Sequence, residues 1–168
     1  MIGQANRNGP GGGLRSEVNE LAPVRSSSEI EIAATPGVAW DVLTAFEAWP
    51  SWNPEIKSVT LEGGVEAGSQ FRWKSGPGTI TSVIQDVEAP RRIAWTGKSF
   101  GITAIHVYKL EQLGTRTLVM TEETYEGTVA RLFNGVLRKK LERVLQSGLR
   151  HLKAEAERRA QTATKEMS

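Results

Sequence analysis

The chain has 168 residues, 39% of them hydrophobic, with a formal net charge of +2 and no cysteine, and this length suits one domain with a single hydrophobic core. The absence of cysteine excludes disulfides and thiolate sites, and two histidines, His106 and His151, are too few for a His-rich metal site, so we expect neither metal nor cofactor. The longest apolar stretches fall far short of the roughly 20 residues of a membrane-spanning helix, so we expect no membrane span.

Residues 1–28 are rich in Gly, Asn, Ser and Arg and contain no apolar core of a secretory signal peptide. We therefore expect a flexible N-terminal arm and a cytoplasmic protein. Order is predicted to begin at residue 29 and to continue to residue 160 as one domain, followed by a flexible tail over 161–168.

The first ordered element is a strand in "SEIEIAAT", where Ile30 and Ile32 alternate with glutamates, as in a half-buried strand. A helix follows in "TPGVAWDVLTAF", with Thr35 as its N-cap and Pro36 at its first position. The next segment, "WPSWNP", holds two of the five tryptophans between two prolines. Such a segment can be neither a helix interior nor a central strand, and it is either a plug that closes a core or the rim of a pocket.

Six short candidate strands follow, separated by Gly- and Pro-containing turns. They cover approximately residues 55–62, 68–75, 79–87, 91–97, 101–111 and 115–126. Strands that follow each other this closely predict an antiparallel meander.

The last element is a long amphipathic helix whose apolar residues recur at helical spacing. They are Val129, Leu132, Phe133, Val136, Leu137, Leu141, Val144, Leu145, Leu149 and Leu152, with Gly148 on the same stripe. A helix this long needs a broad apolar surface, and the meander is the only candidate. Residues 129–160 also carry nine basic and three acidic side chains. They form either a solvated helix face or a patch for nucleic acid, a ribosome or anionic lipid.

The motifs "TPGVAWDVLTAFEAWPSWNP", "GSQFRW", "PRRIAWTG", "HVYKL" and "TEETYEG" stand in this order over residues 28–155. Together they resemble the SRPBCC (START-like, helix-grip) superfamily, and within it the polyketide cyclase/dehydrase-type proteins. The resemblance implies an α+β helix-grip fold: a seven-stranded curved antiparallel sheet wrapped around the long C-terminal helix, with short helices after the first strand. It also implies a deep apolar cavity between the sheet and that helix.

Strand alternation places His106 on one face of "GITAIHVYKL", and we expect that face to point inward. If "QLGT" forms the hairpin loop, Glu111 pairs with Arg116, and His106 lies opposite Thr121 with Glu123 on the diagonal. The alternative row, with Leu118, Met120 and Glu122 inside, is more apolar. The family pattern favours the row that contains Glu123.

An internal His106–Glu123 pair has three interpretations. It is a buried polar pair that satisfies itself, an anchor for a polar group of a ligand, or a catalytic pair in which the carboxylate orients the imidazole and raises its basicity. No nucleophile motif for covalent chemistry is present. A metal site of carboxylates alone stays open, although no spacing of the EF-hand type occurs.

Aromatic and helix residues on inward faces are either core or cavity lining. The candidate ligand-binding residues are Trp40, Trp49, Trp52, Phe71, Trp73, Trp95, Tyr108, Thr121, Tyr125, Leu141, Leu145 and Gly148. Because Trp52 carries the W-x-P resemblance, it is predicted to be the plug, and Trp49 the rim. Gly148 either permits close packing of the helix on the sheet or leaves room for a ligand.

Three functions follow from these observations. The leading hypothesis is binding of a hydrophobic small molecule, lipid-like, polycyclic or polyketide, in the cavity. The alternative is a polyketide cyclase/aromatase or dehydratase that uses His106 as acid and base. The third is a ribosome- or quinone-associated interaction module that uses the basic helix. We do not expect a nucleic-acid partner, since no aromatic-basic platform is present, and the chain is a monomer or a homodimer.

Overall fold

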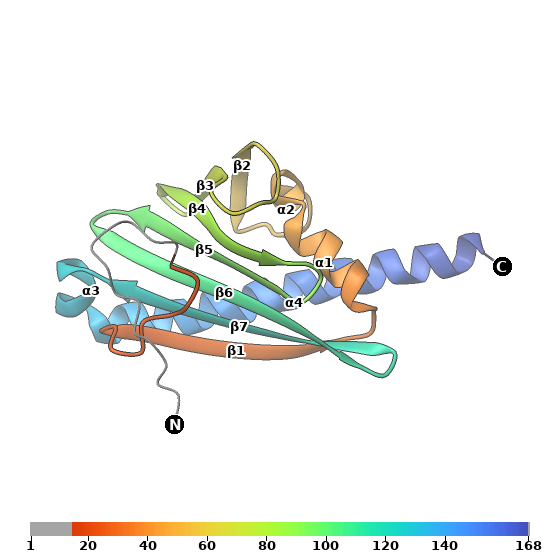
Figure 1. The fold of residues 1–168 in the computed structure, drawn as a ribbon. Helices are drawn as coiled ribbons and strands as arrows, with labels where there is room; N and C mark the ends of the chain where they lie inside the picture. Colours follow the sequence, from red (N-terminus) through yellow and green to blue (C-terminus); the bar gives the residue numbers. More distant parts are fainter. Residues whose placement is uncertain (1–14, 168) are drawn as a thin grey trace, which may run out of the picture.

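The computed structural model describes residues 15–167, in which a single seven-stranded antiparallel sheet curves around a long helix (Figure 1). The strands are β1 (Val24–Ile32), β2 (Ile56–Glu62), β3 (Gln70–Ser75), β4 (Gly78–Glu88), β5 (Arg92–Ser99), β6 (Ile102–Leu113) and β7 (Arg116–Glu126). The helices are α1 (Pro36–Thr44), the 3-10 turn η1 (Phe46–Ala48), α2 (Trp49–Trp52), α3 (Thr128–Leu132) and α4 (Asn134–Glu166). The predicted fold class is confirmed.

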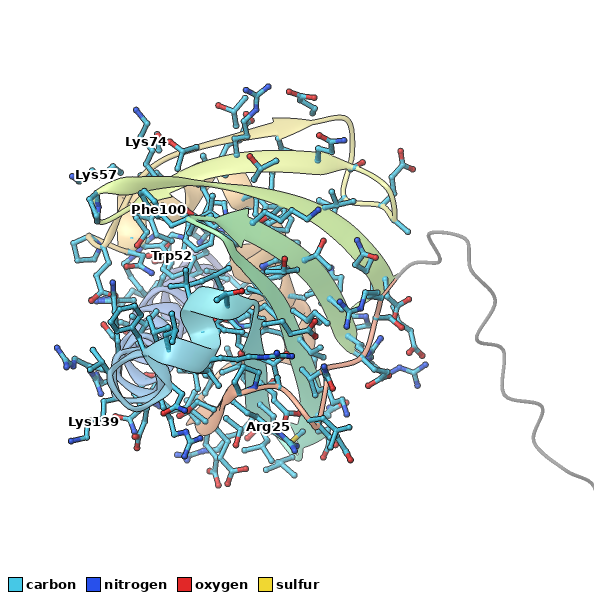
Figure 2. The ribbon with its side chains drawn as sticks, turned by 90° about the vertical axis from the view of Figure 1, so that its left-hand side faces the viewer. Arg25, Trp52, Lys57, Lys74, Phe100 and Lys139 are labelled. Carbon is cyan, nitrogen blue, oxygen red and sulfur yellow. The ribbon has the colours of Figure 1, made fainter. Side chains whose placement is uncertain are left out.

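The strand order is β1-β7-β6-β5-β4-β3-β2, so the meander β2 to β7 is completed by β1, which pairs with β7. Seen end-on, the strands arch around α4 (Figure 2). The register shifts between Ile84 and Asp86 on β4, and such bulges bend a strand and increase its twist. Curvature of this kind leaves an enclosed concave side on which a helix can lie.

The first helix forms as its sequence predicts. The Thr35 hydroxyl accepts a hydrogen bond from the backbone N–H of Val38 at 3.4 Å, and Pro36 occupies the first helical turn. In the "WPSWNP" segment, predicted to be neither a helix interior nor a central strand, Trp49–Trp52 forms a one-turn helix. Proline is tolerated there, since the first turn of a helix has no intrahelical acceptor for its missing N–H.

The β6–β7 hairpin loop is two residues shorter than the expected "QLGT" loop, because Gln112 and Leu113 both belong to β6. Leu113 pairs with Arg116, and Gly114, with φ +60°, is the first residue of a two-residue turn. Glycine at that position is typical of a type II′ turn, whose twist matches the two strands. The predicted pairing of Glu111 with Arg116 is therefore wrong.

The segment before the first strand also differs from the prediction. Residues 1–14 of the expected arm lie outside the described residues, but β1 begins at Val24 instead of residue 29. Residues 15–23 lie against the outer face of the sheet, where Val18 packs on a buried cluster of Ala94, Ile105 and Val107. Both faces of β6 are therefore partly buried, whereas the sequence predicted that only the face with His106 would be.

The C-terminal helix departs from the prediction at both ends. Phe133, with φ −115° and ψ 27°, interrupts it and separates α3 from α4. At the other end, α4 continues to Glu166, beyond the expected start of a tail at residue 161. No helix within residues 15–167 combines the length and apolar character needed to cross a membrane.

The core lies between the sheet, α1, α2 and the middle of α4. Its centre is an aromatic cluster in which the rings of Phe46, Trp49, Phe71 and Trp95 have centroids 4.6 to 6.0 Å apart. The face of α4 that covers the sheet is buried at Leu141, Leu145, Leu149, Leu152 and Ala156. This core fills the end of the fold near α1 and leaves space toward α3.

Candidate functional site

Two adjoining cavities lie between the sheet and α4. They share Trp73, Ser75, Trp95, His106 and Val144, and have volumes of about 70 Å³ and about 210 Å³. The smaller extends beneath α2 and is also lined by Leu43, Trp49, Trp52, Asn53, Glu55, Ile56, Tyr108, Leu145, Gly148 and Leu152. The larger extends toward α3 and is also lined by Ile80, Ser82, Gly97, Ser99, Phe100, Ile102, Ala104, Glu123, Tyr125, Leu137 and Lys140. We treat the two as one candidate site.

Most of the residues named from the sequence line this site. They are Trp49, Trp52, Trp73, Trp95, His106, Tyr108, Glu123, Tyr125, Leu145 and Gly148. An added Cβ at Gly148 would meet no atom within 4 Å. Close packing against the sheet is therefore not what Gly148 permits, and its missing side chain enlarges the cavity.

Four predicted residues lie elsewhere. Trp40 and Phe71 belong to the main core, and Leu141 packs in a separate cluster with Val24 and Ala130. Thr121 is buried behind His106, to which its hydroxyl is hydrogen-bonded. Alternation and helical spacing give the direction in which a side chain points, but not whether another side chain covers it.

His106 and Glu123 lie directly opposite each other on β6 and β7, and not on the diagonal that the expected register implied. His106 Nδ1 is 3.5 Å from Glu123 Oε2, and His106 Nε2 is 2.7 Å from Thr121 Oγ1. The alternative row with Leu118, Met120 and Glu122 points to the outer face, so the inward row of β7 is predicted correctly. Thr121 fixes the ring orientation, while Glu123 faces the cavity beside it.

Burial makes both members of this pair neutral at physiological pH. Loss of hydration raises the pKa of Glu123 to about 8 and lowers the pKa of His106 to about 3. The sequence-based interpretation that Glu123 raises the basicity of His106 is therefore wrong, because the cost of burying two charges exceeds their attraction. The site offers a protonated carboxyl group and a neutral imidazole.

An aromatic wall continues from this pair along β5 and β6. The ring centroids of Trp95 and Tyr108 lie 4.9 Å and 4.7 Å from that of His106 and 5.5 Å from each other, so the three rings pack together. Burial also raises the pKa values of Tyr108 and Tyr125, so both hydroxyls stay protonated. The wall is therefore uncharged and largely apolar, with hydroxyl groups at intervals.

The structure reverses the roles expected for the two tryptophans of "WPSWNP". Trp49 is 4% exposed, packs in the aromatic core, and donates its indole N–H to the carbonyl of Leu43 at 2.8 Å. Trp52 is only partly buried, and its indole N–H is enclosed without a hydrogen-bond partner among the described residues. Trp49 is the plug, and Trp52 presents an unused donor in the wall of the site.

Sequence reasoning missed several lining residues. Ser82 is fully buried and accepts a hydrogen bond from the indole N–H of Trp73 at 3.1 Å. Lys140 brings the one basic side chain to the lining of the larger cavity, and Phe100 lies at its outer end. Helical spacing from Leu137 to Lys140 and Val144 could have indicated this second stripe of α4. Phe100 lies in a turn, where alternation gives no information.

Within residues 15–167, no group of three or more His, Cys, Asp or Glu side chains is placed to hold a metal ion. The polar groups of the site are instead few, with His106 and Glu123 adjacent to each other among aromatic rings. This arrangement suits hydrogen bonds to an organic molecule.

One protein-family model matches most of the chain. The family described as polyketide cyclase / dehydrase and lipid transport matches residues 23–157. A search of curated proteins finds no significant match.

Solved structures share the fold at low sequence identity. A hypothetical protein from Helicobacter pylori is 14% identical with a TM-score of 0.75, and the match covers 93% of this chain and 99% of that one. A START superfamily protein from Mycobacterium smegmatis is 20% identical with a TM-score of 0.59, over 83% of this chain and 98% of that one. The di-domain ARO/CYC protein StfQ from the steffimycin biosynthetic pathway is 20% identical with a TM-score of 0.69, over 82% of this chain and 52% of StfQ.

Proposed function

The chain belongs to the polyketide cyclase / dehydrase and lipid transport family, and from this premise we propose that it binds one hydrophobic small molecule between the sheet and α4. The observation that carries the proposal is the cavity itself. Its lining includes Trp49, Trp52, Trp73 and Trp95, and His106 and Glu123 form one polar pair within it. Apolar pockets with a few placed polar groups are typical of small-molecule sites.

The electrostatics of the site favour an uncharged ligand body. Glu123, with its pKa raised to about 8, donates a hydrogen bond as a carboxylic acid, and the Trp52 indole N–H is a second donor without a partner among the described residues. An anion beside these groups would lose its hydration without gaining an opposite charge. A ligand carbonyl or ether oxygen, in contrast, would satisfy a donor. A lipid-like, polycyclic or polyketide molecule with such an oxygen fits.

The volume of the larger cavity limits how much of a ligand it can enclose. The larger cavity, about 210 Å³, is below the roughly 300 to 1,000 Å³ of common ligand pockets. A ligand of usual size would therefore extend outward past Phe100 and Lys140. Its apolar part would lie against Trp73 and Trp95, and its outer end would reach the basic side chain.

Titration with a neutral polycyclic fluorophore such as 1-aminoanthracene, followed by tryptophan quenching, tests binding. We expect a saturable site with Trp73 and Trp95 as quenched donors. The variant Gly148→Leu, which places a side chain in open space, should weaken binding while the protein stays folded. Gly148→Ser is the matched control, because its side chain is too short to fill the site. No saturable binding by the natural protein would refute the proposal.

A second candidate function is cyclisation or dehydration of a bound polyketide, and the elevated pKa of Glu123 favours it. A protonated carboxyl group in an apolar site can act as a general acid toward a ligand carbonyl. In this mechanism the proton comes from Glu123, while Thr121 and Glu123 hold the neutral His106 in place.

A thioester-linked poly-β-ketone tests the enzyme mechanism, with products identified by mass spectrometry. We expect Glu123→Gln to abolish product formation while binding of the fluorophore is kept. A bound substrate recovered unchanged from the natural protein at all pH values would exclude catalysis and leave a binding protein.

A further inference from the structure

An apolar cluster is exposed to solvent at the outer end of the larger cavity. Leu132, Phe133 and Val136 at the α3–α4 corner are 72%, 57% and 72% exposed, and Phe100 in the β5–β6 turn is 72% exposed. We call these four residues the mouth cluster. Phe100 lines the same cavity as Leu137, which follows Val136 on α4, so the cluster adjoins the opening. Three of the four belong to the stripe that helical spacing assigns to the core.

Basic side chains predominate in the segment that carries three of the four residues of the mouth cluster. Between residues 131 and 143, five exposed basic residues stand against the single acidic residue Glu142. They are Arg131, Arg138, Lys139, Lys140 and Arg143. None of the five forms a salt bridge with another residue of the described chain. In the end-on view, Lys57 and Lys74 lie above Phe100 and Trp52, and Lys139 lies below them (Figure 2).

Phe100 occupies a backbone conformation that phenylalanine rarely adopts. Ser99 pairs with Ile102, so Phe100 and Gly101 form a two-residue turn, with φ +48° and +73°. Turns with two positive φ values favour Asn-Gly or Asp-Gly, and a larger side chain at the first position is strained. The ring lies so close to Gly78 that a Cβ there would be 2.3 Å from it. The fold therefore holds a large apolar side chain outward at a position where a small polar one is more stable.

We propose that this end of the molecule docks on an anionic lipid membrane. The mouth cluster enters the boundary between headgroups and acyl chains, and the neighbouring Lys and Arg side chains contact lipid phosphates. Separate protruding side chains at a turn and a helix corner fit a deformable lipid surface better than a complementary protein pocket. In the docked position the cavity opens onto the bilayer, and an apolar ligand passes between them without crossing water. Docking does not depend on which molecule the cavity holds.

Cosedimentation with vesicles tests the proposal, using phosphatidylcholine alone and a mixture of about three parts phosphatidylcholine to one part phosphatidylserine. We expect binding to the mixed vesicles that weakens with added salt, and little binding to the neutral ones. Phe100→Asn should lower the affinity for mixed vesicles about tenfold, since an apolar anchor is lost. The same variant should be at least as stable as the natural protein, because asparagine suits the turn.

Two single variants, Lys139→Glu and Arg143→Glu, should each lower the affinity for mixed vesicles about fivefold or more. The matched controls are Leu113→Ser and Lys165→Glu, both exposed. Leu113 is the last residue of β6, next to the β6–β7 turn at the end of the molecule opposite α3 (Figure 1). These two variants should bind like the natural protein.

Three results would overturn the proposal. One is that the protein binds neutral and mixed vesicles equally, or binds neither kind. Another is a loss of affinity in the two controls as large as that in Phe100→Asn. The third is binding to polyglutamate without binding to mixed vesicles, which would identify an acidic protein as the partner.

Discussion

Replacing Glu123 with glutamine should remove a loss of stability above neutral pH. Burial raises the pKa of Glu123 from 4.5 to about 8 in the folded protein. Above pH 4.5 the unfolded chain releases this proton while the folded chain keeps it, so the carboxyl group destabilises the fold increasingly as pH rises to about 8. Glutamine has the same shape and carries no proton to lose.

His106 has the opposite effect over a different range. Burial lowers its pKa from 6.5 to about 3. Between these values the unfolded chain binds the proton and the folded chain does not, so stability rises with pH. From pH 4.5 to 6.5 the contributions of Glu123 and His106 cancel. From pH 6.5 to about 8 only Glu123 acts, and the free energy of unfolding falls by about 1.4 kcal/mol per pH unit, or about 2 kcal/mol in all.

Urea unfolding followed by tryptophan fluorescence, from about pH 6 to about pH 9, measures this loss. The natural protein should lose about 2 kcal/mol over the interval, and Glu123→Gln should lose almost none. Glu111→Gln is the control, since Glu111 is exposed on β6, and it should keep the slope of the natural protein. Parallel curves for the natural protein and Glu123→Gln would mean that the folded protein holds Glu123 ionised beside a charged His106. The argument that burial dominates would then fail.

The remaining predictions concern packing and helix termini. Gly148→Ala should raise the free energy of unfolding by about 1 kcal/mol, because alanine favours a helix interior and the space is open; a lower melting temperature would contradict this. Trp49→Ala should destabilise by about 3 to 5 kcal/mol, whereas Trp52→Ala should mainly weaken fluorophore binding, and the opposite pattern would restore the roles inferred from the sequence. Thr35→Ala should cost about 1 kcal/mol through loss of the cap of α1, and an unchanged urea midpoint would show that the 3.4 Å contact to Val38 contributes nothing.

Local patterns predicted most of the fold because they report local physics. Alternation in β6 and β7 reduced the choice to two rows, of which the family resemblance selected the one with Glu123, and the Thr35–Pro36 pair marked the start of α1. The register between β6 and β7 failed because it depends on the turn. Gly114 allows a two-residue turn, and that shift moves the partner of His106 from Thr121 to Glu123.

Burial of the apolar residues was decided only by the tertiary structure. The spacing of Leu132, Phe133 and Val136 is that of a core-facing helix, yet the helix breaks at Phe133 and all three side chains are exposed to solvent. Trp49 and Trp52 are equivalent in sequence, and only packing makes one the plug and the other part of a cavity wall.

The sequence by itself determined most of the strands and helices and which side chains of a strand share a face, because side-chain direction follows backbone geometry one residue at a time. The tertiary structure decided which inward side chains enclose space, which pairs are close enough to interact, and that Glu123 and His106 are uncharged. Those properties depend on which side chains lose contact with water when segments far apart in the sequence pack together. No local pattern of residues shows where that packing occurs.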